Sequence, residues 1–319
     1  MKIDKFILAI IVAIVLAWFF PQPAGPNSGI PLNLIAGIGI SLIFFFYGLK
    51  LSPHQIKTGL RNWKLHILVQ LTTFLIFPLV VLLFYPFINT ENGHTIWLAF
   101  LFLGALPSTV SSSVVMVSIA RGNIPAAIFN ASISGLIGIV ITPLWMGLFM
   151  QQSTVDFNLG EIYIRLITQI LLPVALGLAL HRFWGKFARK HSRYLTLFDK
   201  SVILLIIYKS FSESFENNVF SSINVYDLLL IMGAVIVLFF GIFFLTGYIS
   251  KLLHFDLEDR ITAQFSGTKK SLVHGTVFAK ILFQNSASTG IFLLPIMLFH
   301  PVQLLIISFI ASRHGKREI

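Results

Sequence analysis

Long apolar segments recur from one end of this 319-residue chain to the other. An α-helix needs roughly 18 or more apolar residues to cross the hydrocarbon core of a bilayer, which is about 30 Å thick. Only 11% of the residues are charged, against about 25% in soluble domains, so too few charges exist to cover a water-facing surface. The pattern predicts an all-α polytopic membrane protein with ten transmembrane helices, at residues 4–21, 30–49, 65–87, 95–120, 122–148, 161–181, 198–216, 227–249, 260–284 and 286–311.

The basic residues indicate how the chain is oriented. Most of the 23 Lys and Arg residues fall in the termini and in every second connection, while the opposite connections carry acidic residues such as Glu91, Asp156 and Glu161. Cytoplasmic loops collect Lys and Arg, so both termini are expected in the cytoplasm. The net charge of +11 therefore reflects topology, and no nucleic-acid partner is expected, since no basic patch alternates with stacking aromatics.

The two halves of the chain, residues 1–150 and 151–319, are predicted to be two inverted five-helix repeats within a single membrane domain. Equivalent spans carry polar interruptions: ALPSTVSSSVVMV in the fourth and QFSGTKKSLVHG in the ninth. A helix broken at bilayer depth exposes backbone groups that lipid cannot bind, so they must face protein, water or a ligand. We expect both spans to be broken and to form a transport site.

The fourth and fifth spans supply neutral polar candidates for this site. A dense group of hydroxyls follows a proline in the fourth span: Ser108, Thr109, Ser111, Ser112 and Ser113. In the fifth span, Asn130 and Ser134 share one helix face and Ser132 is offset from it. Hydrogen bonds between packed helices are the alternative role for such residues, but the density beside the proline favours an unwound binding site.

Two adjacent lysines near mid-membrane are the least expected residues in the chain. An ammonium at this depth costs about 2.5–3.5 kcal/mol on insertion scales, and such residues face a cavity or a partner. If the ninth span began after Lys270, only the 14 residues 271–284 would remain to cross the bilayer. His274 shares the face of Lys270 and is either a proton carrier or a packed neutral side chain. The candidates from this span are Gly267, Thr268, Lys269, Lys270, Ser271 and His274.

Several of these segments resemble the bile acid:sodium symporter (BASS/SBF) family, in particular its bacterial SBF-like subgroup of sodium-dependent transporters. The resemblance covers nearly the whole chain and is carried by FFFYGLKLS (44–52), ALPSTVSSSVVMVSIARGN (105–123), NASISGLIG (130–138), SGTKKSLVHG (266–275) and LLPIMLFHPVQL (293–304). It implies a panel domain of spans one, two, six and seven. It also implies a core domain of the other six spans, in which broken helices four and nine cross, and a location in the bacterial inner (plasma) membrane.

The sequence departs from the bile-acid branch of this family where that branch coordinates sodium. Aligning the glycines of the ninth span places Phe265 at a ligating glutamate and Lys269 at a ligating glutamine. Ala127 and Ala131 fall at hydroxyl ligands of the fifth span, and Ser113 matches a ligating serine.

Two hypotheses about the coupling ion remain open. In one, a sodium ion binds near Ser113, Asn130 and Ser134. In the other, the fixed ammonium of Lys269 or Lys270 takes the place of a sodium ion, and coupling moves to protons or vanishes. Apart from sodium, no cofactor is expected.

The sequence therefore predicts a secondary active transporter of a small organic anion, working in the lipid bilayer by sodium- or proton-coupled symport and alternating access. The alternative is a membrane regulatory or scaffold protein without transport activity. An enzyme is not expected, because the His and Glu residues form no catalytic motif and cysteine is absent. No phosphate-binding loop for ATP is present either. The polar residue types suit carboxylates, sulfates and phosphates alike.

Overall fold

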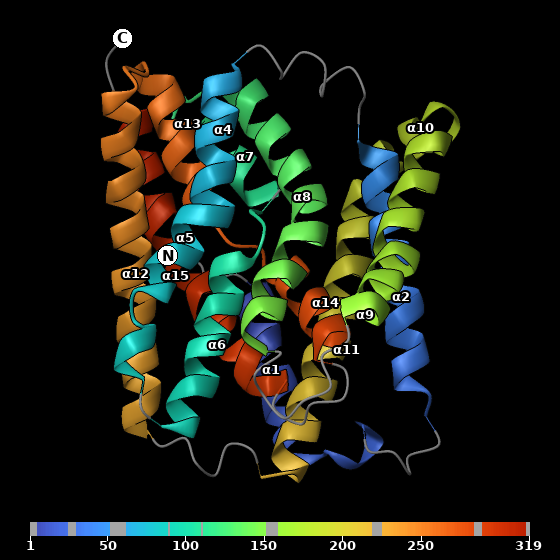
Figure 1. Cartoon of the computed structure of the whole chain (residues 1–319). Coiled ribbons are helices and arrows are strands. Elements are labelled where there is room, and N and C mark those ends of the chain that lie inside the picture. Colours follow the sequence, from blue (N-terminus) through green and yellow to red (C-terminus); the bar gives the residue numbers. More distant parts are fainter. Residues whose placement is uncertain are drawn as a thin grey trace. The chain divides into compact units, whose positions relative to one another are not determined.

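The computed structural model describes residues 5–24, 30–51, 62–88, 90–109, 111–150, 159–218, 225–283 and 289–316, and the regular structure within these ranges is helical (Figure 1). Six of the described helical segments are long and apolar enough to cross a membrane. They are Leu32–Lys50, Trp63–Phe87, Ile124–Met150, Gly160–Lys190, Val225–Leu252 and Thr289–Gly315. An all-helical architecture with six candidate membrane spans is thereby confirmed for the described residues, while the count of ten and the inverted repeat stay predictions.

Contacts divide the chain into two compact units, each assembled from separate stretches. Unit 1 comprises Met1–Ser52, Ser153–Asn224 and Thr276–Leu293. Unit 2 comprises Pro53–Gln152, Val225–Gly275 and Leu294–Ile319. Each unit therefore takes elements from both sequence halves.

Unit 1 is built around a very close crossing of two helices. A Cβ atom at Gly48 would lie 2.2 Å from the Val174 carbonyl oxygen, and one at Gly177 would lie 2.2 Å from the Phe45 carbonyl oxygen. Only glycine permits this approach, which is a common way for membrane helices to pack. The elements of this unit are α1 (Lys5–Phe19), the 3₁₀ turn η1 (Gln22–Ala24), α2 (Leu32–Lys50), α9 (Leu159–Leu166), the π-helical turn η4 (Ile167–Leu171), α10 (Leu172–Lys190) and α11 (Ser192–Glu216).

Unit 2 holds the remaining elements. They are α4 (Trp63–Leu71), the π-helical turn η2 (Thr72–Ile76), α5 (Phe77–Leu82), the 3₁₀ turn η3 (Tyr85–Phe87), α6 (Glu91–Ala105), α7 (Ser111–Ile119), α8 (Ile124–Met150), α12 (Val225–Leu252) and α13 (Leu257–Thr268). Two further helices, α14 (Leu272–Leu282) and α15 (Thr289–Gly315), begin in one unit and end in the other.

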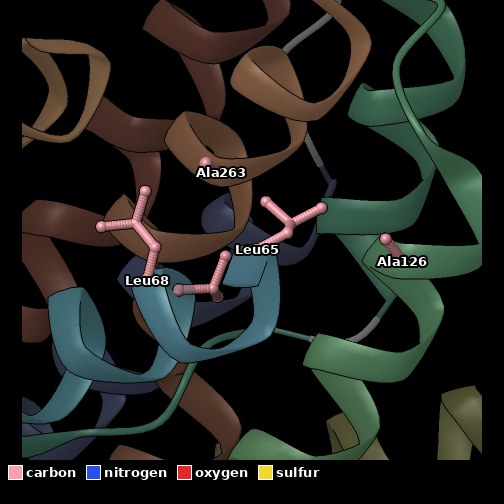
Figure 2. Close-up of a cluster of buried hydrophobic side chains, with 5 residues drawn as sticks. Leu65, Leu68, Ala126 and Ala263 are labelled. Atoms are coloured by element: carbon pink, nitrogen blue, oxygen red, sulfur yellow. The ribbon is translucent and has the colours of Figure 1, made fainter. Parts of the chain in front are cut away.

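A small apolar cluster fixes three helices of unit 2 against one another. Leu65, Leu68 and Val69 of α4 pack against Ala126 of α8 and Ala263 of α13 (Figure 2). All five side chains are buried. The two alanines allow α8 and α13 to lie close to α4, so the polar segments that follow α4 and α13 are held near each other.

Both predicted interruptions are present as breaks between half-helices. The first separates α6, which ends at Ala105, from α7, which begins at Ser111. Leu106 there is extended, with ψ 148°, as expected before Pro107, which disfavours a helical conformation in the residue preceding it. The second break lies between Thr268 and Leu272 and is also extended, with φ −79° and ψ 142° at Lys269.

Candidate functional site

Hydrogen bonds connect the first break to α8 and α13. The Ala105 carbonyl accepts a hydrogen bond from Thr142 Oγ at 2.8 Å. The Ser108 N–H donates to Ser134 Oγ at 2.9 Å, and Ser108 Oγ donates to the Ser266 carbonyl at 2.6 Å. Protein groups thus replace water around an unwound segment that lipid could not satisfy.

The second break is tied to the first through its own backbone. The Ser271 N–H donates to the Pro107 carbonyl at 2.9 Å. The side-chain amide of Gln303 bonds both backbone groups of Lys270, accepting from its N–H and donating to its carbonyl, each at 2.8 Å. Ser271 Oγ also accepts from the His274 N–H at 3.2 Å and lies 2.9 Å from His274 Nδ1. Ser271 therefore caps α14, as serine commonly does at helix starts.

The fully buried Lys270 side chain ends in a group of backbone carbonyls. Its Nζ donates to the oxygens of Thr73 at 2.7 Å, Gly104 at 2.6 Å and Leu106 at 2.9 Å, which we call the carbonyl cage. The same Nζ lies 4.1 Å from the centroid of the Phe77 ring. Three acceptors match the three N–H donors of an ammonium, whereas a neutral amine has only two. The arrangement therefore offers one acceptor to each N–H of a lysine ammonium.

The local backbone explains why these three oxygens are free to bind Lys270. In η2, the Phe77 N–H donates five residues back, to the Thr72 carbonyl. The next residue is Pro78, which has no N–H, so the helix supplies no donor for the Thr73 carbonyl. Gly104 and Leu106 lie at the end of α6, where the last carbonyls lack intrahelical partners and carry partial negative charge.

The neighbouring Lys269 is equally buried but has a different environment. Its Nζ donates to Ser112 Oγ at 3.1 Å, its only hydrogen bond to the described part of the chain. Thr109 Oγ lies 2.8 Å from Ser112 Oγ and 2.9 Å from Ser113 Oγ. We call these four residues the lysine–hydroxyl cluster. It lies at the start of α7, where unpaired N–H groups carry partial positive charge.

The other predicted site residues fall into several environments. Gly267 allows a close approach to η2, since a Cβ there would lie 3.1 Å from Thr72 Cγ2. The Thr268 hydroxyl donates back to the carbonyl of Gln264 in its own helix. The backbone of Ser111 begins α7, but its side chain lies outside the described part of the structure.

The polar residues of α8 divide as the helix geometry predicts. Asn130 and Ser134 are fully buried on one face, and Ser132 is half-buried. The Asn130 side chain donates within α8 and accepts from Gln70 Nε2 at 3.1 Å. Ser132 donates to its own helix one turn back. Asn130 and Ser134 thus have protein partners in this structure.

Three buried oxygens around the breaks were not singled out from the sequence. Gln70 Oε1, Thr72 Oγ and Ser266 Oγ have no hydrogen-bond partner among the described residues. Buried polar atoms are nearly always hydrogen-bonded, so such atoms suggest a bound water, ion or ligand. A glutamine within an apolar span was the available signal for Gln70; a lone Thr or Ser in a membrane helix gives none.

Comparison with known proteins supports the sequence resemblance. The chain matches the model of the SBF-like CPA transporter family over residues 4–316. It is 36% identical to the uncharacterized protein PA2026 of Pseudomonas aeruginosa over 315 residues. These aligned residues cover 99% of this chain and 94% of that protein. A protein of Escherichia coli named "Putative symporter YfeH" is 34% identical over 318 residues, which cover 99% of this chain and 94% of the Escherichia coli protein.

A vertebrate protein shows a similar match. The sodium/bile acid cotransporter 7 of Rattus norvegicus is 30% identical over 312 residues, which cover 95% of this chain and 90% of the rat protein. These matches confirm the resemblance to the bile acid:sodium symporter family, and they indicate a transporter and not an enzyme. The chain belongs to the SBF-like CPA transporter family.

Proposed function

We propose that this protein is a secondary active transporter of a small organic anion, and that the lysine–hydroxyl cluster binds the charged group of that anion. The observation that carries the proposal is the Lys269 side chain, which is fully buried and has one hydrogen bond to the described residues, to a neutral hydroxyl. An ammonium has three donors. No acidic side chain forms an ion pair with Lys269 among the described residues. A buried charge in this state is costly, and an anionic substrate would neutralise it.

The surroundings of Lys269 suit a planar or tetrahedral oxyanion. Ser112, Thr109 and Ser113 can each turn a hydroxyl toward it, and the α7 N-terminus adds backbone N–H groups. Helix N-termini commonly bind phosphate, sulfate and carboxylate groups. Carboxylates, sulfonates, sulfates and phosphate monoesters on a small organic body are therefore the proposed substrate class.

The topology that would carry this transport is also a proposal. The six long helices, α1, α11 and the two broken pairs α6/α7 and α13/α14 would together give ten crossings. Both breaks lie in unit 2, which makes this unit the candidate for the core domain and unit 1 the candidate for the panel domain. Alternating access and an inner-membrane location with both termini in the cytoplasm complete the hypothesis.

Sodium and protons are both candidates for the coupling ion. The names symporter and sodium/bile acid cotransporter, carried by two relatives, support coupled transport. The oxygens of Gln70, Thr72 and Ser266 that have no partner are additional candidate ligands beside Ser113, Asn130 and Ser134. His274, buried next to the second break, is the candidate proton carrier.

The proposal can be tested by thermal unfolding of the purified protein with a panel of organic carboxylates, sulfonates, sulfates and phosphates, followed by uptake of the stabilising anion into proteoliposomes. A bound anion raises the melting temperature by mass action. We expect this shift to disappear in Lys269→Met and to persist in Lys64→Met, a matched control that removes an exposed lysine of unit 2. An unchanged shift in Lys269→Met would overturn the proposed site, and binding without uptake would favour the regulatory alternative.

A further inference from the structure

We propose that Lys270 acts as a tethered monovalent cation: its ammonium occupies a cation site made of backbone carbonyls, so this site needs no diffusible sodium or potassium ion. This inference does not depend on the identity of the transported anion. It concerns the carbonyl cage of Thr73, Gly104 and Leu106, whose oxygens all lie 2.6–2.9 Å from Nζ.

The ligands of Nζ are those of a cation site and not of an ion pair. All three are neutral backbone oxygens, and a further contact is with the Phe77 ring. Carbonyl groups that replace the hydration shell are the usual ligands of monovalent cations at bilayer depth, and an aromatic face adds a cation–π attraction. A single positive charge therefore satisfies the cage without any carboxylate.

The cage is arranged by elements other than the lysine itself. The Thr73 oxygen is released by the π-helical turn before Pro78, and the other two oxygens lie at the negative end of α6. These features depend on Pro78 and on the end of a helix. We therefore expect the three oxygens to stay close together when the ammonium is removed, and the vacant space to accept a small cation.

The backbone of Lys270 is held as firmly as its side chain. Gln303 binds both its N–H and its carbonyl, and Gln303 is itself fully buried. Hydrogen bonds thus fix both the backbone and the ammonium of Lys270. This separates the role of Lys270 from that of Lys269, whose ammonium retains unused donors in the described structure.

The test measures thermal unfolding in choline chloride and then in sodium, potassium, ammonium and methylammonium chloride, without any organic anion. The response of the wild type to each salt is the baseline, because its carbonyl cage is already occupied by the ammonium of Lys270. Lys270→Ala should melt lower in choline and recover by about 3 °C or more with saturating amounts of one or more of the small cations. Lys269→Ala is the matched control and should show no cation-specific recovery.

A folded Lys270→Ala variant without cation-selective recovery beyond the wild-type response would overturn the inference. If Lys270→Ala does not fold, Lys270→Gln tests whether the charge is needed, because its amide can donate to the cage but carries no charge. We expect Lys270→Gln to melt several degrees below the wild type, and equal melting temperatures would show that no cation is needed. Because no organic anion is present, these outcomes are independent of the proposed transport function.

Discussion

Lys269 and Lys270 are adjacent and equally buried, but their ammonium groups have different partners. Lys270 donates to three carbonyls and lies over an aromatic ring, whereas Lys269 has one described hydrogen bond, to a serine hydroxyl. The extended backbone at Lys269 explains the divergence, because successive side chains of an extended chain point to opposite sides. The comparison shows that burial alone does not define the role of a membrane lysine. The number of its partners separates a structural charge from one that is available to a ligand.

The sharpest test of this difference is Lys270→Met, which leaves three buried carbonyls without a donor. Each buried polar group left unsatisfied costs about 1–3 kcal/mol, so we expect a loss of at least about 3 kcal/mol in the free energy of unfolding. Denaturant titration in mixed micelles would measure it. Equal losses for Lys270→Met and Lys269→Met would contradict the distinction.

Gln303→Leu should give the next largest effect, because it removes both hydrogen bonds to the Lys270 backbone. Each buried group left unsatisfied costs about 1–3 kcal/mol, and we expect about 2–3 kcal/mol in total. Gln264→Leu is the control, since Gln264 donates a single described bond, to the Phe243 carbonyl. A smaller loss for Gln303→Leu than for Gln264→Leu would show that the backbone of Lys270 does not need this support.

Ser108→Ala tests the contact between the two breaks. It removes the hydrogen bond to the Ser266 carbonyl, and hydrogen bonds between membrane helices are worth about 0.6–1.7 kcal/mol. We expect a loss of about 1 kcal/mol in the same unfolding assay. Ser132→Ala, whose hydroxyl donates to its own helix, should change stability less, and the reverse order would contradict the predicted importance of this contact.

Lys269→Met should have the smallest effect on stability and the clearest effect on binding. Because the variant removes a buried charge with one hydrogen bond to the described chain, we expect stability to change by less than about 1 kcal/mol or to rise. Anion affinity should fall at least about tenfold, equivalent to about 1.4 kcal/mol. Calorimetric titration with the stabilising anion would measure this, and a strongly destabilised variant would instead assign Lys269 a structural role.

The broken helices were predictable because their causes lie in side chains. Pro107 prevents a regular helix, and the depth of Lys269 and Lys270 within an apolar run requires polar surroundings. The burial of Asn130 and Ser134 on one face followed from helical spacing. These predictions needed only the sequence and the cost of unpaired groups in a bilayer.

The partners of the lysines could not be predicted in the same way. The carbonyl cage consists of backbone atoms, which every residue possesses, so no residue type in the sequence predicts it. Its Thr73 oxygen is available only because η2 is π-helical, and the prolines that follow both π-helical turns do not by themselves specify that form. Which lysine faces which partner depended on where α13 ends, and helix ends are the least certain feature of a sequence prediction.

The π-helical turn η2 also constrains the length of the chain. A π-helical turn contains one residue more than an α-helical turn, so deleting one residue from Thr72–Ile76 would let an ordinary α-helix form. An α-helical turn covers the same rotation with that one residue fewer, so α4 would keep its orientation relative to α5. If Thr72–Ile76 became α-helical without a deletion, α4 would instead rotate by about 100°. The Leu65 and Leu68 side chains would then leave Ala126 and Ala263, and the Phe77 N–H would bond the Thr73 carbonyl. A single-residue deletion should therefore be tolerated better in this segment than in α4 or α5, and an insertion should not.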